Sequence, residues 1–436
     1  MKPGLFRTIA LTYGTQLLAM PLSLASSALQ ARVLGSAGRG QLSVLQTTVG
    51  IAVLYLGLGL PSAITYHLAS KKVSLDQLKG PLSRYLVFAT AALSAILGVL
   101  LITGLEPKVL GHGATPRTIA LVVALFTLTI HNAWMAAVLS SRRDFGAINR
   151  ITLVAVAVPV AGYGLALALG TGGLDPLVIA FSVLLSNEFI KAVLYALRVW
   201  APQATTALVE STTHPIRVMI GFSLLAWACD SIQFLTYRLD VWLVSGYHGD
   251  SALGQYSLAV TLGEMVWLLA SAIAAVFFPH VPTMERSVAI ALTCRLAAFS
   301  FVASFGLALI GFLLSIPLLP IIFTAQFEPS VQLLGILLIG VVPYSIAKVV
   351  GNYLAGSGAM RFSLYSALVS MVVCVTLDLI FIPRFGAIAA AGATATAYCV
   401  FTAVIVESFR RREKLSWSDV LRHARTPQKL APAGGT

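Results

Sequence analysis

The chain has 436 residues and a formal net charge of +13, yet 58% of its residues are hydrophobic and only 10% are charged. A soluble domain carries about 25% charged residues, so this composition excludes an ordinary soluble enzyme or binding module. Apolar runs of about 20 residues, each long enough to cross a bilayer core, recur along the whole length. Because the bilayer core offers no water to the backbone, the sequence predicts an all-α polytopic membrane protein.

Twelve transmembrane helices are predicted, joined by short connections. The first apolar run follows Lys2 and Arg7 and is too long for the core of a signal peptide, so we predict that it is the first spanning helix. No connection is long enough to hold a soluble catalytic domain. The predicted spans are residues 7–34, 41–69, 83–103, 118–140, 149–170, 175–198, 216–247, 254–279, 291–318, 330–356, 362–383 and 387–408.

A glycine-containing segment recurs half a chain apart. Residues 40–43 read GQLS, and residues 254–257, which lie 214 positions later, read GQYS. With six spans in each half, both halves enter the membrane from the same side, which predicts a parallel internal repeat of two six-helix lobes around a central cavity. The predicted parts are an N-terminal lobe at 1–200, a cytoplasmic linker at 201–215, a C-terminal lobe at 216–408 and a basic cytoplasmic tail at 409–436.

The positive charges are distributed unevenly between the two sides of the predicted membrane. With the N-terminus in the cytoplasm, the cytoplasmic segments hold 20 of the 29 lysines and arginines. Such a bias predicts that both termini are cytoplasmic. It also explains most of the net charge as a topology signal facing anionic lipid, so that no nucleic-acid partner is expected. The predicted outer loops hold four: Arg39, Lys108, Arg117 and Arg384.

The sequence contains no recognisable catalytic or metal-binding motif. There is no glycine-rich phosphate loop with Lys and Ser/Thr, no HExxH and no GxSxG, and the acidic residues are scattered. We therefore expect neither catalytic residues nor a cofactor. The cysteines lie singly in apolar segments without CxxC spacing, which predicts small buried side chains, no disulfide and no metal. They are Cys229, Cys294, Cys374 and Cys399.

Charged residues inside the predicted spans are the main functional candidates. Each costs about 2.5–3.5 kcal/mol at the centre of a membrane helix on insertion scales. Span seven carries Asp230, Arg238 and Asp240, and Gln16 lies 214 positions before Asp230. Gln16 and Asp230 are therefore predicted to face a shared cavity from the two lobes, with Arg238 as a further substrate-binding candidate. An interhelical ion pair within one lobe is the alternative for the three charged residues.

Further candidates lie on other spans. Lys348 and Asn352 are four residues apart and share a helix face, where a cavity role and snorkelling of the lysine towards the cytoplasm both remain open. Glu264, near the middle of span eight, is a candidate for proton or cation coupling, as is Asp230. Arg32 ends span one and either binds substrate or marks the outer interface.

Local interactions account for several other polar residues. Glu188 and Lys191 are spaced to pair within one helix, and Asn132 is predicted to make an interhelical hydrogen bond. Three tryptophans are candidates for stacking on sugar rings, although the second is more typical of an interface anchor: Trp227, Trp242 and Trp267.

Three segments resemble one family of transporters. Residues 31–69, ARVLGSAGRGQLSVLQTTVGIAVLYLGLGLPSAITYHLA, resemble the first hairpin of polysaccharide transporters of the O-antigen flippase type, within the multidrug/oligosaccharidyl-lipid/polysaccharide (MOP) exporter superfamily. Residues 236–260, TYRLDVWLVSGYHGDSALGQYSLAV, resemble that family's seventh helix and turn, and AAAGATATAYCV at 389–400 also fits. The resemblance covers residues 5–408. Arg39 departs from it, because an aromatic residue is more usual there, and we expect little effect at an exposed turn.

The resemblance implies a function. Its members flip polyprenyl-diphosphate-linked oligosaccharides from the inner to the outer leaflet of the bacterial inner membrane by alternating access, for O-antigen or exopolysaccharide synthesis. It implies a lipid-linked glycan, membrane lipids and glycan polymerases or other assembly proteins as partners. A diphosphate crosses hydrocarbon only with help, and the basic residues Arg238, Lys348 and Arg32 match that need.

Two alternatives remain open. A drug or cation antiporter of the same superfamily would line its site with acids and aromatics, whereas the cavity candidates here include at least as many bases as acids. A membrane glycan polymerase or ligase would usually carry a large outer loop with catalytic Arg or His. The longest predicted outer loop, 104–117, has about 14 residues.

Overall fold

The computed structural model describes residues 3–69, 73–104, 116–142, 144–170, 173–200, 215–277, 281 and 284–425. Within these ranges the chain is helical and has no strand. Eight helices among the described residues are long and apolar enough to cross a membrane. The predicted all-α polytopic fold is thus confirmed, while the number of twelve spans stays a prediction.

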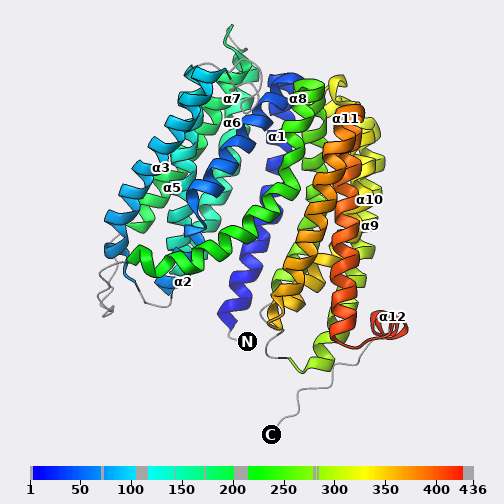
Figure 1. The fold of residues 1–436 in the computed structure, drawn as a ribbon. Helices are drawn as coiled ribbons and strands as arrows, with labels where there is room; N and C mark the ends of the chain where they lie inside the picture. The colour runs from blue at the N-terminus through cyan, green and yellow to red at the C-terminus, as the bar shows by residue number, and fades with distance from the viewer. Residues whose placement is uncertain are drawn as a thin grey trace. The chain divides into compact units, whose positions relative to one another are not determined.

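The helices follow one another with short connections (Figure 1). Their order is α1 (Pro3–Gly57), α2 (Leu60–Ala69), α3 (Leu75–Thr103), α5 (Pro116–Ser141), α6 (Phe145–Leu169), α7 (Pro176–Val199), α8 (Pro215–Phe277), α9 (Arg286–Phe323), the 3-10 turn η2 (Ala325–Phe327), α10 (Pro329–Gly356), α11 (Met360–Arg412) and α12 (Trp417–Arg425).

Three of the longest helices are each divided by one glycine. Gly35 in α1, Gly249 in α8 and Gly386 in α11 have φ of 64°, 81° and 61° with extended ψ, a conformation outside the helical region that glycine adopts without steric cost. Each lies between two predicted spans. In Figure 1 the ribbon of α1 rises from the N-terminus and then turns back, so α1 consists of two helical arms.

Side-chain caps fix the starts of several helices. Ser74 accepts a hydrogen bond from the backbone N–H of Gln77, whose side chain accepts one from the N–H of Ser74, and this capping box starts α3 eight residues before the predicted span. At the start of α6 the side chain of Asp144 accepts from the N–H of Ala147, and at the start of α7 that of Asp175 accepts from the N–H of Leu177. These caps satisfy N–H groups that the first helical turn leaves unpaired.

The chain divides into two compact units. Unit 1 comprises Met1–Leu258, Leu318–Ser330 and Asp378–Ala390, and unit 2 comprises Ala259–Pro317, Val331–Leu377 and Ala391–Thr436. The predicted lobes, 1–200 and 216–408, were placed by the sequence repeat and stay a prediction.

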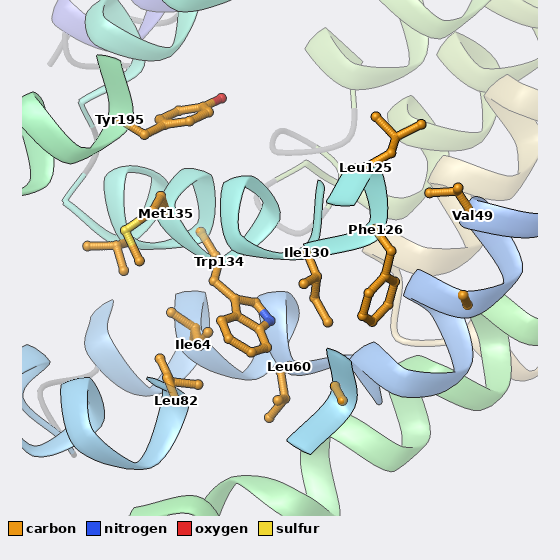
Figure 2. Packing of buried hydrophobic residues seen from close by; sticks show 14 of the residues in the cluster. Val49, Leu60, Ile64, Leu82, Leu125, Phe126, Ile130, Trp134, Met135 and Tyr195 are labelled. Atoms are coloured by element: carbon orange, nitrogen blue, oxygen red, sulfur yellow. The ribbon is translucent and has the colours of Figure 1, made fainter. Parts of the chain in front are cut away.

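Unit 1 contains a large apolar core formed by α1 to α7. Trp134 of α5 is only 1% exposed and lies among Ile64, Leu82 and Ile130, as Figure 2 shows. Phe126 lies one helical turn from Ile130 and belongs to the same cluster as Val49 of α1. Because lipid is as apolar as these side chains, such helices are held together by close packing more than by exclusion of water.

Candidate functional site

A lysine beside two aromatic rings lies within unit 2. Lys348 of α10 places its Nζ 5.1 Å from the ring centre of Trp267 of α8 and 5.4 Å from that of Tyr344 of α10. The ring of Tyr398 of α11 completes the group, 5.2 Å from Trp267 and 4.9 Å from Tyr344 between ring centres. We call these four residues the lysine–aromatic cluster.

The aromatic faces hold the lysine without neutralising it. The negative face of each ring attracts an ammonium group by about 0.5–2 kcal/mol, which offsets part of the cost of a charge inside the membrane. Within the described part of the chain, Lys348 Nζ makes neither a hydrogen bond nor an ion pair. Its N–H donors are therefore available to an anion.

Two other predicted residues lie beside this cluster. Glu264 precedes Trp267 by one helical turn on α8, and its charge interacts with that of Lys348. Asn352 follows Lys348 by one turn on α10, and its side-chain amide donates a hydrogen bond to the backbone carbonyl of Lys348 (2.8 Å). The structure thus brings Lys348, Glu264 and Asn352 together within unit 2.

Arg32, in unit 1, binds the end of another helix. Its Nε donates to the carbonyl oxygen of Ile322 (2.9 Å), and its Nη2 donates to that of Ile321 (2.8 Å). Both carbonyls belong to the last turn of α9, whose oxygens have no partner within the helix and carry partial negative charge. In this conformation the guanidinium stabilises the end of α9.

Arg39 was predicted to lie at an exposed turn, and this prediction was wrong. The side chain is only 6% exposed. Its guanidinium donates to the hydroxyl of Ser27 (3.0 Å), to the side-chain oxygen of Gln30 (3.2 Å) and to the hydroxyl of Ser257 (3.3 Å). The reason is that the chain turns sharply at Gly35, so Arg39 lies in the second arm of α1 and faces the first.

The R-x-D segment of α8 has one fully buried member. Asp240 is 4% exposed and accepts a hydrogen bond from the hydroxyl of Tyr256, which lies beyond the turn at Gly249, while Arg238 is half-buried. Asp240 and Tyr256 therefore join the two arms of α8. The side chains of Asp230 and Gln16, the other two polar candidates, lie outside the described residues.

The interaction predicted between Glu188 and Lys191 is confirmed. The two residues form an ion pair on α7, and Asn132 of α5 donates to the second carboxylate oxygen of Glu188 (2.8 Å). Because the carboxylate is bound on both sides, these residues join α5 to α7.

Sequence reasoning missed three residues. Tyr344 lies one turn before Lys348 on the same helix face, a spacing that is visible in the sequence. Tyr398 is the one aromatic residue in a stretch of small residues, AAAGATATAYCV. Asp378 is 1% exposed within α11, and the pattern that could have identified it in the sequence is an acidic residue within an apolar run. No group of three or more potential metal ligands occurs among the described residues.

The fold defines a class of protein, the polytopic helical membrane proteins. A family model described as polysaccharide biosynthesis protein matches residues 29–332. This is more than half of the chain, and the chain belongs to that family. No curated protein matches it in sequence.

Solved structures of a lipid II flippase and of MATE family transporters share the fold. A lipid II flippase MurJ in an inward closed conformation has a TM-score of 0.71 and 13% identity, with 95% of this chain and 90% of that chain covered. An inward-facing multidrug resistance MATE family transporter of the MOP superfamily has a TM-score of 0.67 and 12% identity, covering 92% of this chain and 96% of its own. An outward-facing multidrug resistance MATE family transporter of the MOP superfamily has a TM-score of 0.55 and 13% identity, with 96% of each chain covered. The fold expected from the resemblance is confirmed, and at these identities the solved structures bear on the fold alone.

Proposed function

We propose that the protein is a flippase that moves a polyprenyl-diphosphate-linked oligosaccharide from the inner to the outer leaflet by alternating access. The membrane is a bacterial inner membrane, with both termini in the cytoplasm, and the product supplies O-antigen or exopolysaccharide synthesis. Membership of the polysaccharide biosynthesis family carries this proposal. The fold, shared with a lipid II flippase, supports transport of a lipid-linked glycan over catalysis.

The charged groups within the helices fit an anionic lipid. Lys348 presents N–H donors that no described residue occupies, and Arg238 is half-buried in α8. A diphosphate entering hydrocarbon loses its hydration, and fixed cations replace part of that lost interaction. Both residues are therefore assigned to substrate binding. The proposed substrate-binding residues also include Gln16, Asp230, Arg32 and Asn352. The residues proposed for ion coupling are Glu264 and Asp230.

The second candidate is a drug or cation antiporter, and one specific observation favours it. Glu264 lies one turn from Trp267, and an acid beside aromatic rings suits an organic cation. Lys348 next to the same ring opposes a cationic ligand, which is why we place the flippase first.

Reconstituted proteoliposomes separate these functions. The substrate is a fluorescent polyprenyl-diphosphate oligosaccharide. The readout is the fraction of this lipid that a reagent outside the vesicle can reach, compared between vesicles with and without the protein. Efflux of ethidium is measured in parallel vesicles. Lipid movement without ethidium efflux supports the flippase, whereas ethidium efflux without lipid movement overturns it in favour of the antiporter.

A further inference from the structure

The lysine–aromatic cluster has features of a ligand site that the fold alone does not require. It draws its residues from three helices: Trp267 from α8, Tyr344 and Lys348 from α10, and Tyr398 from α11. All four lie within unit 2, so their arrangement belongs to one compact part of the molecule. Trp267 and Lys348 keep partial exposure, whereas Tyr344 and Tyr398 are buried.

Two kinds of interaction are offered at the same point. An ammonium with unused donors attracts a phosphate or a carboxylate. The aromatic ring of Trp267 beside it offers an electron-rich surface on which the C–H groups of a sugar ring pack. A neutral sugar would use only the ring, and a simple anion would use only the lysine, whereas a sugar next to an anionic group uses both.

We infer that the lysine–aromatic cluster binds the part of the substrate where a sugar ring adjoins an anionic group, with Lys348 binding the anion and Trp267 packing on the sugar. This inference rests on the proposed function and assigns part of the substrate to four residues. The anion has two possible sources, the diphosphate that links the glycan to its lipid and the carboxylate of an acidic sugar.

Glu264 acts as the internal competitor at this site. Its negative charge acts on Lys348 from within the same unit, so it opposes the approach of an anion to the lysine. The substitution Glu264→Gln removes the competitor and is expected to tighten binding of the anionic lipid, whereas Lys348→Gln weakens it. Opposite effects of two neighbouring substitutions are not expected if the cluster only holds helices together.

The test measures affinity and transport separately, with the purified full-length protein in nanodiscs. Three lipids serve as probes: a polyprenyl diphosphate bearing a neutral disaccharide, one bearing a glucuronic-acid disaccharide, and a polyprenol bearing the acidic disaccharide without phosphate. The variants are K348Q, K348R, E264Q and W267L. The matched control is K79Q, because Lys79 also lies over a tryptophan, 4.4 Å from the ring centre of Trp200, but outside unit 2.

We expect K348Q to weaken binding by about tenfold or more, K348R to retain most of the affinity, and K79Q to leave it unchanged. A loss for both diphosphate lipids identifies the diphosphate as the anion, and a loss confined to the two acidic glycans identifies the sugar carboxylate. Where K348Q does not purify as a folded protein, W267L makes the same test, since it removes a ring that holds the ammonium.

The inference is overturned if a folded K348Q or W267L binds all three lipids within about twofold of the wild type. Failure of the proposed function gives a different result, in which wild-type protein binds the lipids but does not move them across proteoliposomes. If the wild type transports the lipid and K348Q binds it undiminished, the proposed flippase function stands, but the lysine–aromatic cluster is not part of its substrate site.

Discussion

Gly40 and Gly254 approach the backbone of the opposite helical hairpin in the same way. A Cβ on Gly40 would lie 1.8 Å from the carbonyl oxygen of Asp250, and a Cβ on Gly254 would lie 1.8 Å from that of Ser36. Asp250 lies 214 positions after Ser36, and Gly254 lies 214 positions after Gly40. The sequence repeat therefore exchanges the two halves of this contact. Within unit 1, the start of the second arm of α1 and the start of the second arm of α8 meet by an approximate two-fold relation.

The first prediction concerns side chains at this contact. Gly40→Ala or Gly254→Ala forces the two backbones apart, because the obstructing atoms are main-chain atoms that no rotamer change can move. We expect each to lower the stability of the folded protein by about 1–3 kcal/mol, measured as thermal unfolding in detergent. Gly98→Ala in α3, where a Cβ meets nothing within 4 Å, is the control and should be neutral or slightly stabilising. Unchanged unfolding of both G40A and G254A would contradict the close backbone approach.

The second prediction uses two serines at the same contact. The hydroxyls of Ser36 and Ser251 lie 2.7 Å apart, a distance that suits a disulfide after substitution of both by cysteine. In a background without the native cysteines, we expect S36C/S251C to crosslink on oxidation. If the two hairpins must separate during transport, oxidation stops lipid movement and a reductant restores it.

The crosslink can be detected independently of transport. A protease site placed in residues 201–214 yields two fragments that stay joined only through the disulfide. The single substitutions S36C and S251C should release both fragments under the same conditions. Complete separation of the fragments from the oxidised double variant would show that the serines are not neighbours in the membrane.

Local patterns in the sequence predicted the helices and their breaks. The helices follow runs of apolar residues, and Gly35, Gly249 and Gly386 lie where the apolar pattern predicted that one span ends and the next begins. The ion pair of Glu188 and Lys191 was also predictable from a local pattern, because residues three positions apart on one helix are neighbours on its surface.

Contacts between distant helices were not predictable in this way. Arg39 is buried because two arms of α1 pack together, and nothing in the surrounding residues specifies which face they share. The ring of Trp267 meets Lys348 from a position 81 residues earlier in the chain, and Tyr398, 50 residues after Lys348, packs against that ring. The position of a single side chain depends on tertiary packing. The pattern of hydropathy along one sequence does not specify that packing.

The third prediction follows from the buried position of Arg39. Its guanidinium joins Ser27 and Gln30 on the first arm of α1 to Ser257 on α8. Arg39→Leu removes the buried donor from these half-buried acceptors, which we expect to cost about 1–3 kcal/mol of folding stability. Arg39→Lys keeps the charge but cannot reproduce the planar set of donors, so an intermediate loss is expected.

Thermal unfolding in detergent measures both variants. Arg384→Leu provides the control, because Arg384 was also predicted to lie in an outer loop and its side chain is exposed. We expect R384L to change stability by less than about 0.5 kcal/mol. Equal unfolding temperatures for R39L and R384L would mean that the hydrogen bonds of Arg39 contribute nothing to stability.

The fourth prediction concerns pH and the connection before α6. Asp144 accepts a hydrogen bond from the N–H of Ala147 (3.1 Å) and from Nε of Arg198 at the end of α7 (2.6 Å). Partial burial acts to raise the pKa of Asp144, but these hydrogen bonds and the charges of Arg198 and Arg150 outweigh it, so the pKa lies below its usual value. A carboxyl whose pKa is lowered by folding stabilises the protein above its unfolded pKa of about 4, and this contribution is lost as the pH falls through the folded pKa.

Asp144→Asn is therefore expected to destabilise the protein at pH 7, and the difference from wild type should shrink as the pH falls below about 4. The measurement is thermal unfolding of both proteins in detergent at a series of pH values. Asp76→Asn is the control, because Asp76 pairs with Lys79 at a site where both side chains are largely exposed, and such pairs contribute little. A difference between wild type and D144N that stays constant from neutral to acid pH would mean that the carboxylate charge has no part in holding α6 to α7.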